Sequence, residues 1–302
     1  MADGTKILVE SVETQGSVAL PAGRKGRWLR SLTRDKKALT SAVVLLGLTI
    51  AAIFAPYLSP YDPNAQNFQM LQAPSAQHLL GTDSLGRDLF SRILYGARVS
   101  LIVGISTVAI ALIVGVLLGL LAGYYGGWLD MLIMRYIDLQ WAFPNFIIAV
   151  YLVAIFGTGL VNVIVAVSLA FFDDFARLTR SVVLSIREED YISAAQAIGT
   201  PDRRILWKHI LPNAVAPIIV QATVSVSYAI LAEAGLSFLG LGVKASTPSW
   251  GSILSDARSF IYSAWWLGVF PGLAIMVTVL SINFLGDGLR DILDVREYQE
   301  EN

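Results

Sequence analysis

The amino-acid sequence predicts an all-α, polytopic membrane protein with six transmembrane helices. Hydrophobic residues make up 55% of its 302 positions and charged residues only 15%, whereas about a quarter of the residues are charged in an ordinary soluble domain. The hydrophobic residues also gather in long runs, and a helix needs about 20 of them to cross the hydrocarbon core of a bilayer. Composition and run length therefore agree on a chain that crosses a membrane several times.

Six apolar runs give the expected spans, and several of them end at glycine or proline. They are residues 38–57, 99–124, 132–156, 160–184, 214–236 and 267–285. Glycines in the stretch 115–127 would permit tight packing of the second span against another helix. The polar segment 1–37 has no small-residue cleavage site placed as in a signal peptide, so the first run is expected to be a retained span.

Lysine and arginine residues orient the chain, because they are enriched in cytoplasmic segments. The N-terminal segment 1–37 holds eight of them, and a second basic segment lies between the fourth and fifth spans. Both termini, including the tail 291–302, are therefore expected in the cytoplasm. The loops 58–98 and 237–266 are then external, and residues 99–290 form a transmembrane domain of five helices.

The sequence has few or none of the residues that disulfides, metal sites, nucleophilic catalysis and nucleotide binding require. The sequence has no cysteine and only two histidines, His78 and His209, so it excludes disulfides and thiolate nucleophiles and predicts no metal site and no catalytic residue. The net charge of −1 gives no sign of nucleic-acid binding. The phosphate-binding motif GxxxxGK[ST] is also absent, so we expect the chain to bind no cofactor of its own and to depend on a separate ATPase for energy.

Residues 187–213 predict two short helices joined by a turn on the cytoplasmic side. The first part is rich in alanine, and Gly199 suits the left-handed end of its helix. Thr200 can cap a second helix with Pro201 in the first position, and Pro212 is expected to break the chain before the fifth span. Periodicity alone favours a loop that simply covers the end of the bundle.

The spacing of Ala194-Ala195, Gly199 and Leu211-Pro212 resembles the EAA loop of bacterial ABC importer permeases. In that family the loop forms the coupling helix, which docks in a groove on the ATPase subunit. Ser193 and His209 stand where the family usually has glutamate and isoleucine. The missing glutamate affects one anchoring contact but not the role of the loop. The resemblance assigns coupling to Tyr191, Ser193, Ala194, Ala195, Gly199, Asp202, Arg203, Leu211 and Pro212.

Longer segments extend the resemblance over most of residues 38–296. The segments are 81–101 (GTDSLGRDLFSRILYGARVSL), 236–242 (LSFLGLG), 248–251 (PSWG) and 266–294. They are similar to the C-type permease subunits of bacterial dipeptide, oligopeptide and nickel ABC importers. Several long matches in the expected order are far more specific than one short motif.

The resemblance implies a permease in the cytoplasmic (inner) membrane that forms half of a translocation pathway through the lipid bilayer. Its partners would be a homologous second permease subunit, two ATP-binding cassette subunits that use ATP and Mg, and an extracytoplasmic substrate-binding protein. The substrate would be a di- or oligopeptide, with nickel chelates or glutathione as alternatives. ATP-driven closure of the ATPases would act through the coupling loop to switch the cavity between its two openings.

Four charged residues stand close together in the loop after the first span: Asp83, Arg87, Asp88 and Arg92. In a helix, Asp88 and Arg92 are four apart and could pair. For each residue alone, a solvated loop with local ion pairs is the favoured interpretation. Taken together and with the resemblance, the residues predict an external scaffold around the pore mouth, where the binding protein docks.

Asp173 and Asp174 lie near the middle of the fourth span. Two adjacent carboxylates are costly against lipid, and helical neighbours point about 100° apart. We therefore expect at least one of them to line the translocation path and attract a cationic group, such as the free amine of a peptide. The alternative is that the span starts later and both lie at the cytoplasmic interface. In the third span, Arg135 and Asp138 are expected to pair within the helix near the membrane interface, with a substrate contact as the less favoured alternative.

Two other classes of function stay open. An intramembrane enzyme would need a histidine and an acid at matched depth, but the two histidines fall in opposite loops. A carrier that works alone could use the paired aspartates to bind a coupling ion. The absence of an evident inverted repeat and the presence of the EAA-like loop count against the carrier.

Overall fold

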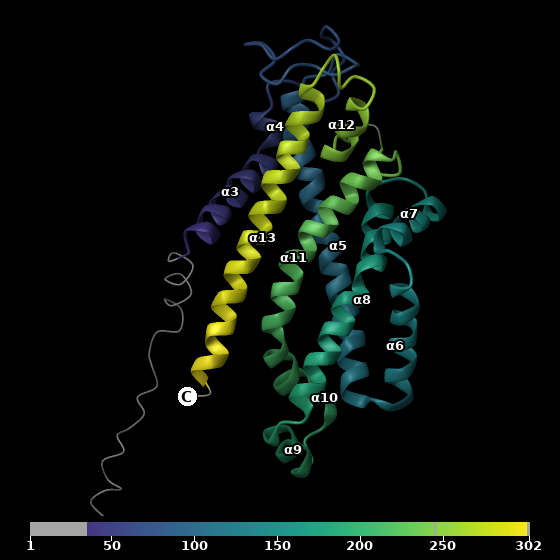
Figure 1. Cartoon of the computed structure of the whole chain (residues 1–302), viewed down its shortest axis with the longest axis vertical. Helices are drawn as coiled ribbons and strands as arrows, with labels where there is room; N and C mark the ends of the chain where they lie inside the picture. The colour runs from purple at the N-terminus through teal and green to yellow at the C-terminus, as the bar shows by residue number, and fades with distance from the viewer. Residues whose placement is uncertain (1–34, 245, 301–302) are drawn as a thin grey trace, which may run out of the picture.

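The computed structural model describes residues 35–244 and 246–300, and this part of the chain folds almost wholly into helices. Long helices run side by side in one bundle (Figure 1). The helix α9 (Asp190–Ala197) lies at one end, and residues 59–88 fold over the other end together with α12 (Trp250–Ala257). We call residues 59–88 and α12 the cap, and we name the two ends of the bundle the α9 end and the cap end.

The first and last long helices pack along each other on one side of the bundle (Figure 1). They are α3 (Lys36–Ile53), which continues into the short α4 (Ala55–Leu58), and α13 (Trp266–Glu300). A Cβ atom on Gly288 of α13 would lie only 2.5 Å from the Cβ of Ala38, so glycine permits this close approach. Helix α13 extends past residue 285, where the sixth span was expected to end.

The centre of the bundle is the pair α5 (Leu89–Tyr125) and α8 (Leu160–Arg187). Gly115, Gly119 and Gly123 form one stripe of α5 that faces α8, and a Cβ on any of them would lie within 2.8 Å of an atom of α8. Small residues at this spacing let two helix backbones approach closely in a membrane. The packing expected for these glycines is confirmed. Helix α5 also begins ten residues before the expected start of the second span, because the side chain of Asp88 caps it.

The third expected span, residues 132–156, is not one helix. Helix α6 (Gly127–Trp141) and helix α7 (Asn145–Phe156) meet at an angle of 91°. Pro144 causes the break, because it has no N–H for the helical ladder and its ring disfavours helical backbone at Phe143. The expectation of one continuous helix here was wrong, and α7 turns away from α6 near mid-height of the bundle (Figure 1).

The fifth span begins earlier than expected, because Pro212 does not break the chain. The short α10 (Asp202–Ile205), a π-helical turn η1 (Leu206–Ile210) and α11 (Leu211–Phe238) follow one another as a single apolar helix. Pro212 stands in the first turn of α11, directly after the π turn. A π turn accommodates an irregular hydrogen-bond ladder, so the helix passes the proline without a break.

Four helices in the described part of the chain are long and apolar enough to cross a membrane, and the bent pair α6–α7 brings the number to five. Helix α8 has 28 residues, enough to cross a bilayer, but its charged residues keep it out of this count. The six expected spans fall on these five and on α8, and the number of six membrane crossings stays a prediction.

Candidate functional sites

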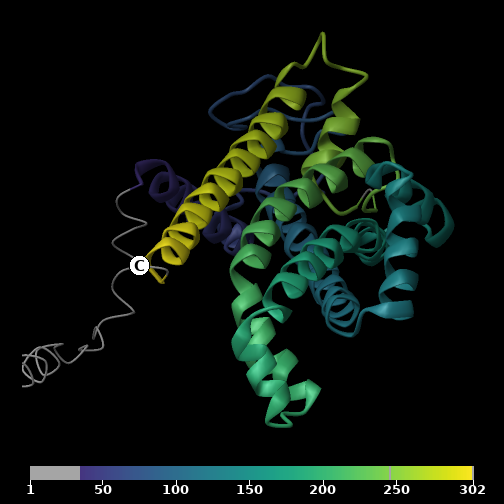
Figure 2. The same ribbon diagram turned by 60° about the horizontal axis from the view of Figure 1, so that its bottom comes forward.

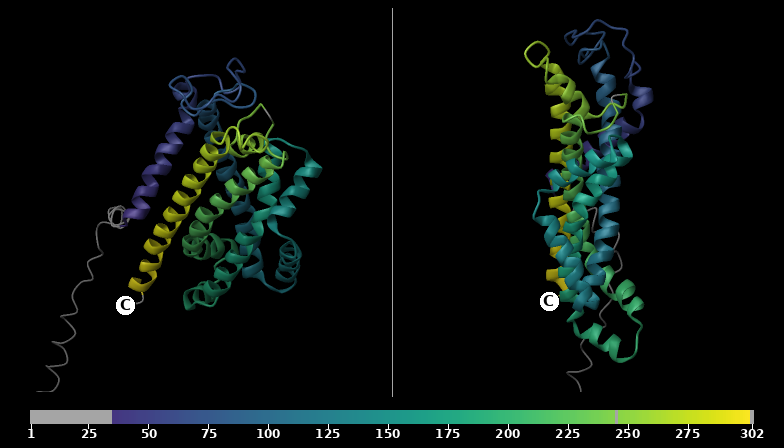
Figure 3. Two further views of the ribbon diagram at one scale, coloured as in Figure 1. Left: turned by 45° about the horizontal axis from the view of Figure 1, so that its top comes forward. Right: turned by 90° about the vertical axis from the view of Figure 1, so that its right-hand side faces the viewer.

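The segment 187–213, which we call the coupling segment, projects beyond the other helices at the α9 end (Figures 2 and 3). Helix α9 ends at Gly199, whose φ is +75°. The N–H of Gly199 donates to the carbonyl of Gln196 at 3.0 Å, and the N–H of Thr200 donates to that of Ala195 at 3.0 Å. These two bonds form a Schellman motif, which requires the left-handed conformation that glycine adopts most readily. The expected left-handed stop at Gly199 is confirmed, whereas the expected cap at Thr200 is wrong, since the second helix is preceded by Pro201.

The coupling segment has a buried apolar face and an exposed face of small residues. Ile192 and Ala195 are buried in one cluster with side chains of α5, α8, η1 and α11. On the opposite side of α9, Ser193 and Ala194 are exposed. Ile198 at the tip is 82% exposed, and periodicity did not single it out. The exposed part of α9 thus carries the small residues Ser193 and Ala194 beside the polar Asp190 and Gln196, and its tip carries one exposed large apolar residue.

Side-chain hydrogen bonds tie the coupling segment to the bundle and join its two ends. The hydroxyl of Tyr124, near the end of α5, donates to Asp202 Oδ1 at 2.7 Å. The side-chain amide of Asn213 donates to the Tyr191 hydroxyl at 3.1 Å, which joins the start of α9 to the start of α11. The structure thereby brings together the two ends of the predicted coupling set. Of the remaining members, Arg203 and Pro212 are exposed and Leu211 is half-buried.

The cap carries a buried cluster of charges that includes all four residues predicted as an external scaffold. Arg87 Nε donates to Asp83 Oδ2 at 2.6 Å, and the Arg92 Nε lies 3.4 Å from the same oxygen. Arg87 also reaches Asp256 of α12, with 2.9 Å between Nη2 and Oδ2. Asp83, Arg87 and Arg92 are all at most 5% exposed. The interpretation of these residues as a solvated loop is therefore wrong, because the cap folds around them.

The expected pair of Asp88 with Arg92 does not form. Asp88 Oδ2 instead accepts from the backbone N–H and the hydroxyl of Ser91 at the start of α5, and Asp88 Oδ1 lies 2.9 Å from Nδ1 of His78. The His78 ring is in turn packed against Phe68, with 4.5 Å between ring centroids. No pattern in the sequence singled out His78 or Asp256 as members of this charge cluster, because each joins the cluster only through the fold.

The two aspartates of the fourth span have different environments. Helix α8 starts at Leu160, so both lie near its middle. Asp173 is fully buried, and neither of its carboxylate oxygens has a hydrogen-bond partner in the described part of the chain. Asp174 is only half-buried. Of the two, Asp174 is the one whose carboxylate can be reached from outside this chain.

Helices α6 and α8 are joined by two ion pairs. Arg180 donates through Nε and Nη2 to the two oxygens of Asp130 at 2.5 and 2.6 Å. Arg177 donates to Asp138 at 2.8 Å, and its guanidinium lies 4.0 Å from the centroid of the Trp141 ring at the bend. The expected pairing of Asp138 with Arg135 is wrong, since Asp138 pairs across helices.

Comparison with known proteins agrees with this arrangement. Residues 115–297 match the family described as binding-protein-dependent transport system inner membrane component, and residues 26–74 match the N-terminal transmembrane domain of oligopeptide transport permease C. The chain is 51% identical over 268 residues to a dipeptide transport system permease of Alkalihalophilus pseudofirmus, covering 88% of each chain.

Two further relatives cover similar shares. The chain is 45% identical over 285 residues to a di/tripeptide transport system permease of Pseudomonas aeruginosa, covering 92% of this chain and 94% of the relative. It is 46% identical over 271 residues to a glutathione transport system permease of Pectobacterium atrosepticum, covering 88% and 89%. The chain therefore belongs to the family of inner-membrane components of binding-protein-dependent transport systems, the multi-pass permease subunits of ABC importers.

Proposed function

We propose that this chain is a permease subunit of an ATP-driven importer of di- and oligopeptides and forms half of its translocation pathway. The observation that carries the proposal is the coupling segment, a projecting helical turn at one end of an apolar bundle. A stand-alone carrier has no use for such a segment. The peptide class is supported by the names of two relatives, a dipeptide and a di/tripeptide permease.

The coupling segment is suited to transmit motion from an ATPase. Its outward face carries Ser193, Ala194 and Ile198, and small residues let another protein approach closely. Its inward face shares one apolar cluster with α5, α8 and α11. A displacement of α9 would therefore move the ends of three long helices together, because close-packed side chains transmit strain rather than absorb it.

The remaining partners follow from the mechanism. Two ATP-binding cassette subunits would bind ATP and Mg and dock on the coupling segments of this chain and of a homologous second permease. The α9 end would then face the cytoplasm together with both termini, in keeping with the basic residues near it. The permease itself would hold no cofactor and catalyse no reaction.

The cap would be the docking platform for the extracytoplasmic substrate-binding protein. Its charge cluster, with Asp83, Arg87, Asp88 and Arg92, ties residues 59–88 to α5 and α12. A platform held by buried ion pairs keeps its shape when a partner binds. The scaffold role predicted for these residues rests on this rigidity and on their place at the end opposite α9 (Figure 1).

Glutathione is the second candidate substrate, because a relative at 46% identity is a glutathione transport system permease. Glutathione is itself a short peptide with a free amine and two carboxylates. A permease for small peptides needs no change of mechanism to carry it, so the choice depends on the binding protein and the path.

Uptake into proteoliposomes tests the proposal. The vesicles would contain this chain with its partner permease, ATPases and binding protein, and labelled dipeptide, pentapeptide and glutathione would be offered in turn. We expect ATP-dependent uptake with the wild-type chain and with Ala194→Ser, and none with Ala194→Trp, whose bulky ring blocks the outward face of α9. The chain should still fold and pair with the second permease in all three, so that loss of uptake reports the contact with the ATPase.

Two results would contradict the proposal. Uptake that continues without the ATPase subunits would establish a carrier that works alone. Uptake by Ala194→Trp equal to that of the wild type would remove the coupling role from α9, although the chain could remain an importer subunit.

A further inference from the structure

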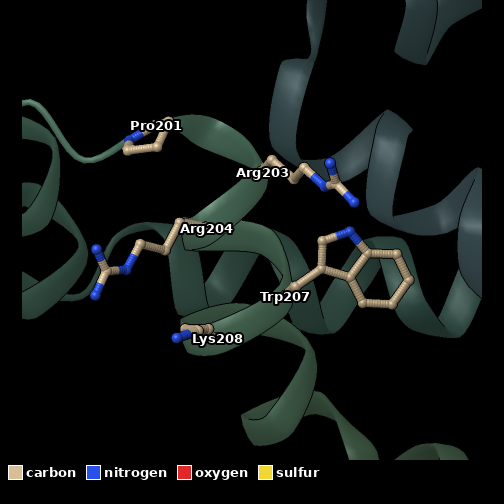
Figure 4. A pocket seen from close by; sticks show the side chains of 5 residues that line it. All are labelled: Pro201, Arg203, Arg204, Trp207 and Lys208. Atoms are coloured by element: carbon tan, nitrogen blue, oxygen red, sulfur yellow. The ribbon is translucent and has the colours of Figure 1, made fainter.

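The exposed side of α10 and η1 forms a shallow basic pocket within the coupling segment, and of its lining residues only Arg203 belongs to the predicted coupling set. It has a volume of about 380 Å³ and is lined by Pro201, Arg203, Arg204, Trp207 and Lys208. Arg204 and Lys208 extend to one side of the helix, and Arg203 and Trp207 extend to the other (Figure 4). Three cations and an indole ring thus border one surface depression.

The pocket is the polar side of an amphipathic helix. Ile205, Leu206 and Ile210 are buried on the opposite side, so the exposed side cannot rotate inward. Arg203, Arg204 and Lys208 form no ion pair with any residue that the structure describes. The adjacent acid, Asp202, accepts a hydrogen bond from Tyr124. The three positive charges therefore lack a counter-ion within the described chain.

Two contacts fix the depth of the pocket at the end of the transmembrane helices. Asp202 bonds to Tyr124, one residue before the end of α5. Arg187, the last residue of α8, donates to the carbonyls of Gly123 and Tyr124. The helix that carries the pocket also continues directly into the apolar span that ends at Phe238. The pocket therefore lies level with the ends of α5 and α8, where these long helices would leave a bilayer, whereas α9 projects further out (Figure 1).

Exposed aromatic residues at the same level agree with this depth. Trp207 is 51% exposed, Tyr125 is 51% exposed and Trp128 is 71% exposed. Tryptophan and tyrosine concentrate at the height of lipid headgroups, where an amphipathic ring meets both tail and water.

We propose that this pocket binds the phosphate-bearing headgroup of an anionic phospholipid from the leaflet at the α9 end. The forked guanidinium groups of arginine match phosphate oxygens, and lysine adds a point charge. Clusters of basic residues at the end of a span attract anionic lipids. An acidic surface of a partner protein is a weaker match, because the outward face of α9 lies further from the membrane and is the side open to a docking partner.

A lipid bound here would lie between α9 and α11, on the part of the coupling segment nearest the transmembrane helices. It would hold α10 at the membrane surface while α9 moves. The binding itself does not depend on the importer assignment, because its chemistry involves only this chain and the bilayer.

Lipid retention by the purified chain tests the inference. Native mass spectrometry would count phosphatidylglycerol and phosphatidylcholine molecules retained after extraction from mixed vesicles. The variant is Arg204→Gln/Lys208→Gln, which leaves Arg203 in place. The control is Lys36→Gln/Lys37→Gln, which removes the same charge from exposed residues at the start of α3.

We expect the wild type and the control to retain phosphatidylglycerol in preference to phosphatidylcholine. Each cation lost from the pocket should weaken retention about fivefold, and the pair about twenty-fivefold. Inorganic phosphate at millimolar concentration should not displace the lipid, because a free ion lacks the contact of the acyl chains; displacement would assign the site to soluble phosphate.

Three results would overturn the lipid site. They are equal retention of both lipids by the wild type, equal loss in the control, and unchanged retention by the variant. If unchanged retention came with failure of the variant to bind the ATPase subunits, the pocket would be a protein interface instead. Transport need not be measured in any of these arms, so failure here is separable from failure of the importer proposal.

Discussion

Gly119 lies where α5 crosses α8, and the site has room for a hydrogen atom only. A Cβ there would lie 2.5 Å from the carbonyl oxygen of Ala176 and 2.6 Å from the Cβ of Thr179. Gly119→Ala must push the two helices apart, and overpacking of this kind costs about 1–3 kcal/mol. Thermal unfolding of the purified chain should therefore begin at a lower temperature.

Gly47 supplies the matched control for this prediction. It lies in α3 with no atom near its added Cβ, so Gly47→Ala should be neutral or should stabilise the helix by up to about 1 kcal/mol. Equal changes in melting temperature for the two variants would show that close packing at Gly119 contributes nothing.

Asp83 holds two buried arginines at once, which makes it the most sensitive charge of the cap. Asp83→Asn leaves Arg87 and Arg92 short of a counter-charge, and breaking a buried pair costs about 3–5 kcal/mol. We expect a large fall in melting temperature and rapid proteolysis of residues 59–88. Asp62→Asn is the control, because Asp62 is exposed in the same loop; a comparable loss there would mean that burial is not the cause.

At the scale of single residues, the sequence predicts which charged residues matter in the cap but not which residues they pair with. The spacing of Asp83 and Arg87 permits a local pair, and that pair forms. Arg87 also pairs with Asp256, 169 positions away, and no local pattern encodes that contact. The same holds for Asp138, whose partner Arg177 belongs to another helix.

Among the structural elements, the prolines show how far local sequence rules can predict where a helix breaks. Pro144 breaks an apolar run, whereas Pro217 and Pro271 lie inside continuous helices. Neighbouring helices and local adjustment can re-satisfy the backbone groups that a proline frees in a membrane span. The bend at Pro144 also allows Trp141 to meet Arg177, a contact that composition alone cannot foresee.

The two ion pairs between α6 and α8 should differ in strength. Asp130 and Arg180 form a two-bond pair with side chains 20% and 31% exposed, whereas Asp138 and Arg177 are 50% and 39% exposed. A double-mutant cycle with Asp130→Asn and Arg180→Gln should give a coupling energy of about 1–3 kcal/mol. The cycle with Asp138→Asn and Arg177→Gln should give about 0–1 kcal/mol, as for exposed pairs.

Unfolding in denaturant would measure both cycles. The reverse order of the two coupling energies would show that the cation–π contact of Arg177 with Trp141, rather than the geometry of the carboxylate pair, fixes α6 against α8.

For the whole molecule, the sequence predicted a helical bundle with a projecting coupling segment and a charged loop at the opposite end. It could not predict which faces of the helices surround a path, because lipid, a second permease and a substrate all meet apolar or half-polar surfaces. The structure separates the two aspartates of α8, because Asp173 is fully buried and Asp174 is partly exposed. Only a reachable carboxylate can contact a passing peptide, so Asp174 is the candidate for the translocation path.

Asp174 is therefore the residue whose change should alter substrate preference. Asp174→Asn should lower uptake of a dipeptide with a free amine about tenfold relative to its N-acetylated form, the factor that corresponds to about 1.4 kcal/mol of lost attraction. Asp173→Asn should leave that ratio unchanged, because its carboxylate is enclosed by this chain, and any loss of uptake should come from a lower yield of folded protein. Competition between the two peptides in the same proteoliposomes measures the ratio independently of yield. A ratio that moves in Asp173→Asn and stays fixed in Asp174→Asn would exchange the two roles, and a ratio fixed in both would remove the pair from the translocation path.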